Sequence, residues 1–85
     1  MQVAFHRNFK KQYKKLPQKI QDQFNRRLGL FMEDNTHPLL NVHPLRGNDV
    51  PLMSINITGD YRALFVQDGE VVVFHYIGTH GELYS

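Results

Sequence analysis

Side chains able to move protons and to bind phosphate are concentrated in the second half of this sequence. The C-terminal stretch YIGTHGELYS carries an imidazole at His80 and a phenol at Tyr84, just past the last apolar segment. Asp60 and Arg62 lie in the apolar segment before it, and His43 precedes Pro44 earlier still. Histidine has an ordinary pKa of ~6.5 and acts as acid or base near neutral pH, while arginine clamps phosphate and keeps its charge.

This set of groups meets the chemical needs of RNA cleavage. A base removes the proton of a ribose 2′-hydroxyl, which attacks the neighbouring phosphorus, and an acid protonates the departing 5′-oxygen. We expect Arg62 to hold the phosphate and Asp60 to orient a histidine or the ribose. His80 and His43 supply acid and base in an order that the residues leave open, and Tyr84 suits stacking on an unpaired base. The nucleophile belongs to the substrate, so we expect no cofactor.

Each of these residues also has a purely structural interpretation. Asp60 and Arg62 alternate along one strand and can form a surface ion pair of little energetic value. His43 beside a proline suits an ordinary loop, and Tyr84 can anchor the C-terminus as a hydrophobic plug. His75 lies inside an apolar segment, where a packed histidine is expected rather than a functional one.

A metal site is not expected. The sequence has no Cys and no His-Glu-x-x-His motif, and its remaining histidines, His6 and His37, show no ligand spacing. The missing cysteines also exclude a disulfide framework and favour a cytoplasmic protein. There is no signal peptide and no run of ~20 apolar residues, so we expect one soluble domain over residues 1–85 with no membrane contact.

The charge is distributed unevenly. Residues 1–27 hold eight Lys or Arg and one acid, whereas the rest holds two Arg and seven acids. A basic half predicts a polyanionic partner, either nucleic acid or an acidic protein, although a solvated helix face explains the same lysines. We expect Lys10 and Lys14 to bind RNA phosphates, and Arg46 to face the substrate from the segment that supplies His43.

The N-terminal half predicts one strand and two helices. Residues 2–6 alternate weakly, and Asn8 is the expected cap of a helix whose apolar stripe is Phe9, Tyr13 and Leu16. Pro17 ends that helix and starts another, in which Ile20, Phe24, Leu28 and Phe31 repeat the helical period. Residues 34–48 are rich in Asn, Pro and Gly and predict a loop.

The C-terminal half predicts a β-meander over residues 50–57, 60–66 and 70–77, with turns at Thr58-Gly59 and Asp68-Gly69. The fold class is α+β with the order β-α-α-β-β-β, in which a helical hairpin covers one face of a small, mostly antiparallel sheet. The other face has little left to cover it. Alternation puts Asp60 and Arg62 on one face and Tyr61 on the other, and His80 reaches the first two if the last strands are antiparallel.

Three segments resemble the RelE/ParE superfamily of bacterial type II toxins: HPLRG at 43–47, INITGDYRALF at 55–65 and IGTHGELY at 77–84. The branch most similar is that of the YafQ-like mRNA interferases, and FKKQYKKLPQKIQDQF fits as well, so the resemblance covers nearly the whole chain. It implies a microbial-RNase-like fold, cleavage of mRNA in the ribosomal A site, and neutralisation by a cognate antitoxin in a hetero-oligomer.

The resemblance also implies residue roles. His43, Asp60, His80 and Tyr84 match the YafQ pattern, Arg62 matches the arginine that the RelE branch uses on phosphate, and Tyr61 takes the place of a tryptophan. Two positions depart from the pattern, with Asn56 in place of a catalytic histidine and Tyr76 in place of an arginine.

We expect Asn56, Tyr61 and Tyr76 to contact the substrate. Two alternatives remain open at this stage: a ParE-like protein that poisons DNA gyrase without enzymatic activity, and a decayed module that only binds an antitoxin.

Overall fold

A five-stranded sheet forms the centre of the computed structural model, which describes residues 1–47 and 50–84. The strands are β1 (Gln2–Phe5), β2 (His43–Pro44), β3 (Met53–Asn56), β4 (Tyr61–Asp68) and β5 (Val71–Thr79). Their order across the sheet is β1-β5-β4-β3-β2, with β1 parallel to β5 and the other pairs antiparallel. The predicted α+β class and the mostly antiparallel sheet are therefore confirmed.

Two helices follow β1 as predicted, α1 (Arg7–Lys14) and α2 (Gln18–Glu33). The expected cap of α1 was wrong, because His6 occupies the N-cap position and its Nδ1 accepts the backbone N–H of Asn8 at 3.1 Å. An imidazole nitrogen can replace the usual hydroxyl or carboxylate oxygen as the acceptor here. Pro17 lies at the N-cap of α2 and separates the helices.

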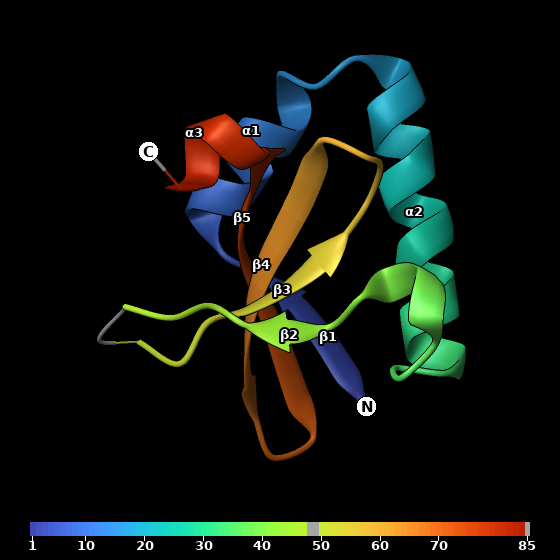
Figure 1. Ribbon diagram of the computed structural model, residues 1–85, viewed down its shortest axis with the longest axis vertical. Coiled ribbons are helices and arrows are strands. Elements are labelled where there is room, and N and C mark those ends of the chain that lie inside the picture. The colour runs from blue at the N-terminus through green and yellow to red at the C-terminus, as the bar shows by residue number, and fades with distance from the viewer. Residues whose placement is uncertain (48–49, 85) are drawn as a thin grey trace.

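The hydrophobic core lies between the helices and one face of the sheet (Figure 1). Aromatic rings dominate it: Phe24 of α2 meets Phe74 of β5 edge-on with ring centroids 5.5 Å apart, and Phe31 meets Phe65 at 5.2 Å. Phe9 of α1 packs against both Phe24 and Phe74. Burial of these large side chains supplies most of the apolar driving force available to so short a chain.

A β-bulge in β5 sets which side chains face the core. Leu64 pairs with Tyr76, but the next residue, Phe65, pairs with Phe74, so His75 is an extra residue opposite β4. The extra residue lets Phe74 and Ile77, three positions apart, both lie in the core. Simple alternation along β5 would have placed them on opposite faces.

Two features of the fold differ from the sequence prediction. Residues 34–48 were expected to form only a loop, but the described part contains a 3₁₀ turn, η1 (Pro38–Leu40), and the strand β2, which pairs with β3; Asn48 lies outside the described residues. The second sheet face is also less open than expected. A third helix, α3 (His80–Tyr84), lies on the side of the sheet opposite α2 (Figure 1).

Candidate functional site

The sheet register brings four of the expected site residues onto the face opposite the core. Directly paired residues share a face, so one row runs across the sheet through His43, Ser54, Leu64 and Tyr76. The neighbouring row runs through Asn56, Arg62 and Gly78. His43 was expected in a loop, but it belongs to β2, where pairing with β3 places it beside Ser54.

Helix α3 is fixed to this face by its own first turn. The Thr79 hydroxyl accepts the Glu82 N–H at 3.2 Å, and the Thr79 N–H donates to Glu82 Oε1 at 2.8 Å. These reciprocal bonds form a capping box, which explains Thr79 and Glu82 in the GTHGE sequence. The His80 N–H also donates to the Asp60 carbonyl at 2.8 Å, so the start of α3 is held against the turn before β4.

Tyr84 links the two histidines of the candidate site. Its ring meets the His80 ring edge-on, with centroids 4.3 Å apart and planes at 88°. Its hydroxyl lies 3.1 Å from Ser54 Oγ, and Ser54 is the cross-strand partner of His43. Sequence reasoning missed Ser54, because a fully buried serine in an apolar strand carries no signal of its own.

The His43 ring has a defined proton arrangement. Its Nδ1 lies 2.6 Å from the carbonyl oxygen of Asn41. Because a carbonyl can only accept, Nδ1 carries the proton. In the neutral ring the lone pair is therefore on Nε2, and this nitrogen can accept a proton from a ligand.

Arg62 is held by the turn that precedes its strand. Nη1 donates to the carbonyls of Thr58 at 2.8 Å and Tyr61 at 3.0 Å, and Nη2 donates to the carbonyl of Gly59 at 3.1 Å. A guanidinium has five N–H donors. Nε–H forms no hydrogen bond among the residues that the structure describes, and it lies on the same edge of the group as one N–H of Nη2. That edge has the geometry of a bidentate phosphate contact.

Asp60 does not form the surface ion pair with Arg62 that the sequence suggested, because β4 starts only at Tyr61 and Asp60 belongs to the turn. Its carboxylate is exposed, and the Arg62 guanidinium bonds to backbone carbonyls instead. The contribution of Asp60 to the site is its carbonyl, which holds α3.

Four further expected residues lie outside these two rows. Tyr61 packs against the core, on the opposite side of the sheet from Arg62. Lys10 and Lys14 border a separate apolar hollow of about 480 Å³ between α1 and α2. Arg46 is exposed just after β2, next to a residue that borders the groove described below.

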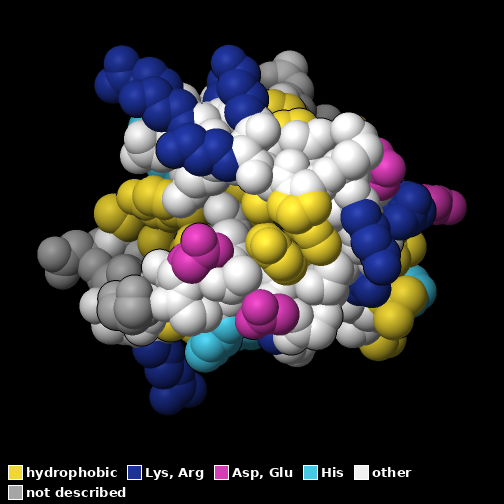
Figure 2. Space-filling model, turned by 90° about the horizontal axis from the view of Figure 1, so that it is seen from above, with side chains coloured by type: hydrophobic (Ala, Val, Ile, Leu, Met, Phe, Trp, Pro, Cys, Tyr) yellow, Lys and Arg dark blue, Asp and Glu magenta, His cyan; other side chains and the backbone are white. Residues whose placement is uncertain are grey.

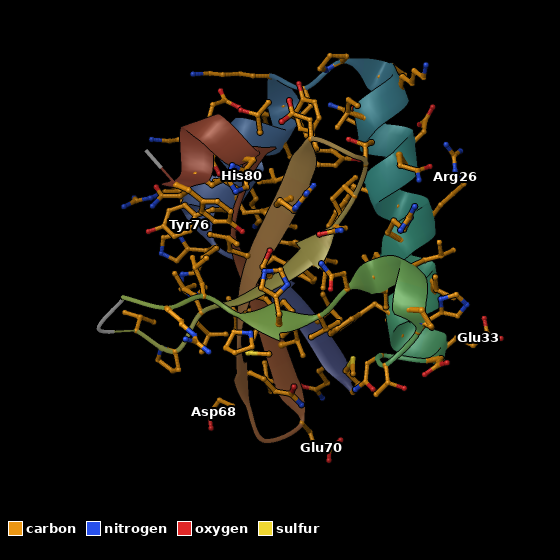
Figure 3. All side chains as sticks on the ribbon, viewed as in Figure 1. Arg26, Glu33, Asp68, Glu70, Tyr76 and His80 are labelled. Carbon is orange, nitrogen blue, oxygen red and sulfur yellow. The ribbon has the colours of Figure 1, made fainter. Side chains whose placement is uncertain are left out.

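A groove of about 520 Å³ adjoins the two rows. Tyr76 lies on the same side of the sheet as His80 and α3 (Figure 3). Leu64, which is buried, lies between Ser54 and Tyr76 in the first row. The complete lining is Gln12, Leu45, Val50, Leu52, Leu64, Tyr76, Glu82 and Leu83. The lining is mixed, because the polar groups of Gln12, Tyr76 and Glu82 lie among aliphatic side chains.

Two polar groups near the site have unusual environments. The Thr79 N–H, and after it the Thr79 hydroxyl, lower the pKa of the Glu82 carboxyl, so this group stays ionised and keeps its place in the cap. Asn56 Oδ1 is buried and has no hydrogen-bond partner among the described residues. An unsatisfied buried acceptor is costly, and a donor that reached it would remove that cost.

Positive charge lies mainly on the N-terminal helices. The exposed lysines of this region are Lys10, Lys11, Lys14, Lys15 and Lys19. Seen from above, the largest group of Lys and Arg side chains lies at the upper left, with further ones at the right and at the bottom, while acidic side chains are scattered (Figure 2). Within residues 1–47 and 50–84 there is no group of three or more His, Asp or Glu side chains placed to bind a metal.

Comparison with known proteins identifies the fold. No family model matches the sequence, and no curated protein matches it significantly. Among solved structures, YafQ in the DinJ–YafQ toxin–antitoxin complex of Escherichia coli superposes with a TM-score of 0.81 at 15% identity, over 98% of this chain and 96% of YafQ.

Two other toxins superpose almost as well. The archaeal RelE–RelB complex of Pyrococcus horikoshii gives a TM-score of 0.74 at 19% identity over 94% of each chain. A YoeB/ParE toxin of Agrobacterium tumefaciens gives 0.75 at 15% identity, over 94% of this chain and 99% of that one. The fold expected from the resemblance is thus confirmed. Among the described residues, no helix combines the length and apolarity needed to cross a membrane.

Proposed function

We propose that this protein is the toxin of a type II toxin–antitoxin system and that it cleaves mRNA on the ribosome without a metal ion. The observation that carries the proposal is that the sheet register puts His43 and Arg62 on one face, against which Tyr84 and its neighbour His80 are held by the Ser54–Tyr84 contact. The fold shared with YafQ and RelE supports the same reaction class. No deeply buried group has to be uncovered, since His80 is exposed and Arg62 is partly exposed.

The geometry suggests a role for each group. The open edge of Arg62 holds the scissile phosphate, and Nε2 of His43 accepts the proton of the ribose 2′-hydroxyl. The 2′-oxygen then bonds to phosphorus as the bond to the 5′-oxygen breaks, and protonated His80 donates to that departing oxygen. The products are a 2′,3′-cyclic phosphate and a 5′-hydroxyl. Tyr84 keeps His80 in place, and Asp60 acts through its contact with α3.

The departures from the YafQ pattern leave this chain with fewer ionisable groups. Asn56 can donate or accept a hydrogen bond but cannot transfer a proton, and Tyr76 offers a ring where an arginine is expected. We therefore infer that His43 and His80 carry the acid–base work alone. Tyr76 contacts the substrate through its ring, and the exposed lysines of α1 bind RNA phosphates in a salt-dependent way.

A cognate antitoxin is the expected protein partner. The YafQ and RelE structures that this chain resembles are complexes with DinJ and RelB. We infer that this chain forms a comparable hetero-oligomer, and that the free protein acts in the cytoplasm, where ribosomes carry mRNA. The basic N-terminal region suits either an acidic antitoxin or ribosomal RNA.

Induction of the chain in a bacterial host, with and without the adjacent open reading frame, tests the proposal. We expect growth arrest from the chain alone, relief by the neighbouring gene, and new mRNA 5′ ends in primer extension. Intact transcripts during arrest, or full toxicity in a His80→Ala, Arg62→Ala double variant, would contradict it. The amounts of soluble variant protein must match that of the wild type.

A second candidate function is gyrase inhibition without catalysis. Arg62 donates to three carbonyls of its own turn, which gives this residue a structural purpose independent of any phosphate. A gyrase inhibitor would leave transcripts intact while producing gyrase-linked DNA breaks. The same induction experiment, read for DNA breaks as well as for mRNA ends, separates the two functions.

A further inference from the structure

The wall of the 520 Å³ groove contains a carboxylate among uncharged side chains. Glu82 lines the groove together with Gln12, Tyr76 and five aliphatic residues, and among these described lining residues only Glu82 carries a charge. The bonds that it makes with Thr79 hold the pKa of its carboxyl below the ordinary value, so the group is ionised at neutral pH. A phosphate is therefore repelled by the groove, and a cation is attracted to it.

The Glu82 carboxylate lies close to the Tyr76 ring. Its Oε1 would be 3.1 Å from a methyl group placed on Gly78. Gly78 and Tyr76 are two residues apart in the regular part of β5, so they share a sheet face at a separation of about 7 Å. A cation is attracted to an aromatic face when it lies within about 6 Å of the ring centre. One cationic group placed between them can thus contact both the carboxylate and the ring.

Arginines of this chain lie near the groove but do not line it. Arg62 pairs with Gly78 across the sheet, and its guanidinium bonds to carbonyls of its own turn. Arg46 follows Leu45, which does line the groove. The cation that the Glu82 carboxylate attracts therefore has to come from another molecule.

The other polar groups of the groove can accept hydrogen bonds. Helix α1 lies beside β5, and Oε1 of Gln12 accepts the N–H of Ile77 at 2.8 Å. An amide oxygen has two lone pairs, so this atom keeps a second acceptor position. The Thr79 N–H takes one of the roughly four acceptor positions of the Glu82 carboxylate. A guanidinium, which has five N–H donors and no acceptor, matches such a set.

We propose that the groove binds an arginine side chain of a partner polypeptide, with the guanidinium stacked on the Tyr76 ring and directed at the Glu82 carboxylate. Arginine suits the site better than lysine because its planar head stacks on aromatic rings and is less strongly hydrated. Its methylene stem packs along Leu64 and Leu83. The remaining apolar walls hold aliphatic neighbours of the arginine, which a free amino acid lacks. A polyamine fits less well, because its several charges would face a single carboxylate.

The same ring is the one proposed to contact RNA. An arginine stacked on Tyr76 and an RNA substrate would therefore exclude each other, a consequence that rests on the proposed function. The binding of arginine does not rest on it, because it requires no cleavage.

NMR titration of the protein with two matched peptides tests the site. The probe is acetyl-Leu-Arg-Leu-amide, and its control carries citrulline, which has nearly the shape of arginine but no charge. We expect the arginine peptide to bind about tenfold more tightly, since the control loses both the ion pair and the attraction to the ring. The backbone amide signals of Leu64, Tyr76 and Leu83 should shift. Equal affinity for the two peptides, or shifts confined to other residues, would overturn the proposal.

Substitutions separate the two contacts of the guanidinium. Glu82→Gln removes the charge but keeps a side-chain oxygen for the Thr79 N–H, so it should weaken the arginine peptide about threefold and leave the citrulline peptide unchanged. Glu33→Gln removes the same charge at the end of α2, far from Tyr76, and should change neither (Figure 3). Should Glu82→Gln fail to fold, Tyr76→Leu must weaken the arginine peptide by a similar factor. Wild-type affinity in both groove variants would overturn the proposal.

The outcomes separate this site from the nuclease. Arginine-dependent shifts in a protein that leaves mRNA intact support the site and remove only the nuclease. Cleavage of mRNA by a protein whose groove signals do not respond to the arginine peptide would overturn the site and leave the nuclease. Groove signals that respond more strongly to spermidine than to the peptide, or to a dinucleotide and not to the peptide, would also overturn it.

Discussion

The hydroxyl of Tyr84 lies 3.1 Å from Oγ of Ser54, a residue thirty positions earlier in the chain. This contact crosses β4 and joins the C-terminal helix to β3. It also connects the two histidines of the proposed site, because His80 packs on the Tyr84 ring and His43 is paired with Ser54. The Tyr84 phenol thus positions α3 on the sheet, a role that packing of the core alone does not require.

Removing either hydroxyl should weaken this connection. Tyr84→Phe keeps the ring contact with His80 and should cost about 1 kcal/mol of unfolding free energy, as should Ser54→Ala. The double variant should cost less than the two single changes together, with a coupling of roughly 0.5–1 kcal/mol in chemical denaturation. Tyr84→Ala also loses the ring contact with His80, so it should lower cleavage more than Tyr84→Phe does. Strict additivity of the two single changes would argue against the bond.

The capping box of α3 predicts a local stability effect. Thr79→Ala should speed amide hydrogen exchange in α3 about fivefold, whereas Thr79→Ser should retain the cap. The pKa of Glu82 lies below its ordinary value of 4.5, so its contribution is fully present above that pH and is lost as the pH falls through the lower folded value. Loss of Thr79 amide protection in wild type while the pH is still above 4.5 would contradict this assignment.

Two glycines next to this cap provide a matched pair. A methyl group on Gly78 would lie 3.1 Å from Glu82 Oε1, so Gly78→Ala should displace the carboxylate and reproduce the exchange of Thr79→Ala. A methyl group on Gly81, inside α3, would meet nothing within 4 Å. Gly81→Ala should therefore leave the cap intact and slightly favour the helix.

Much of this fold was accessible from the sequence because its signals are local. The helical spacing of Ile20, Phe24 and Phe31 and the hairpin signal at Asp68-Gly69 depend only on near neighbours. The helix was predicted correctly, and the turn was predicted one residue early, since its loop is Gly69-Glu70. The bulge at His75 and the strand at His43 depend on pairing between distant segments, which no local pattern records.

The site residues show the same division. His43, Arg62, His80 and Tyr84 were named from their chemistry and from a family resemblance. Ser54 and Gln12 are ordinary polar residues whose importance comes only from what they contact. The expected Asp60–Arg62 pair failed because the strand begins one residue later than alternation assumed.

The stacked pair of His75 and His6 predicts a pH dependence outside the site. Burial, and after it the neighbouring His6, lower the pKa of His75 from its ordinary value of 6.5. The rings are stacked with centroids 4.8 Å apart. The folded protein therefore prefers neutral His75, and stability should be full above pH 6.5 and fall as the pH drops through the lower folded value.

Urea denaturation midpoints between pH 5 and pH 8 would measure this dependence. The profile of His75→Asn should be flatter than that of wild type. His6→Asn, which supplies another N-cap residue while removing the neighbouring imidazole, should flatten it only in part. A His75→Asn profile that parallels the wild type would show that other groups cause the acid sensitivity.

The bonds from Arg62 to its turn predict that lysine cannot replace it. A single ammonium cannot reach the carbonyls of Thr58, Gly59 and Tyr61 in the planar arrangement that the guanidinium uses. Arg62→Lys should lower the unfolding free energy by roughly 1–2 kcal/mol, measured by urea denaturation. If Arg62 also holds phosphate, Arg62→Lys should reduce cleavage even at a temperature where the wild type and the variant are both fully folded.

The chemical ends of cleaved mRNA test the central claim most directly. Transcripts from cells that express the protein would be mapped at nucleotide resolution, with enzymatic discrimination of 5′-hydroxyl from 5′-phosphate ends and of cyclic from linear 3′-phosphates. The account predicts new ends that carry a 5′-hydroxyl and a 2′,3′-cyclic phosphate, and that disappear in a folded His43→Ala, His80→Ala variant. Growth arrest with no new ends, or ends that persist unchanged in that variant, would contradict it.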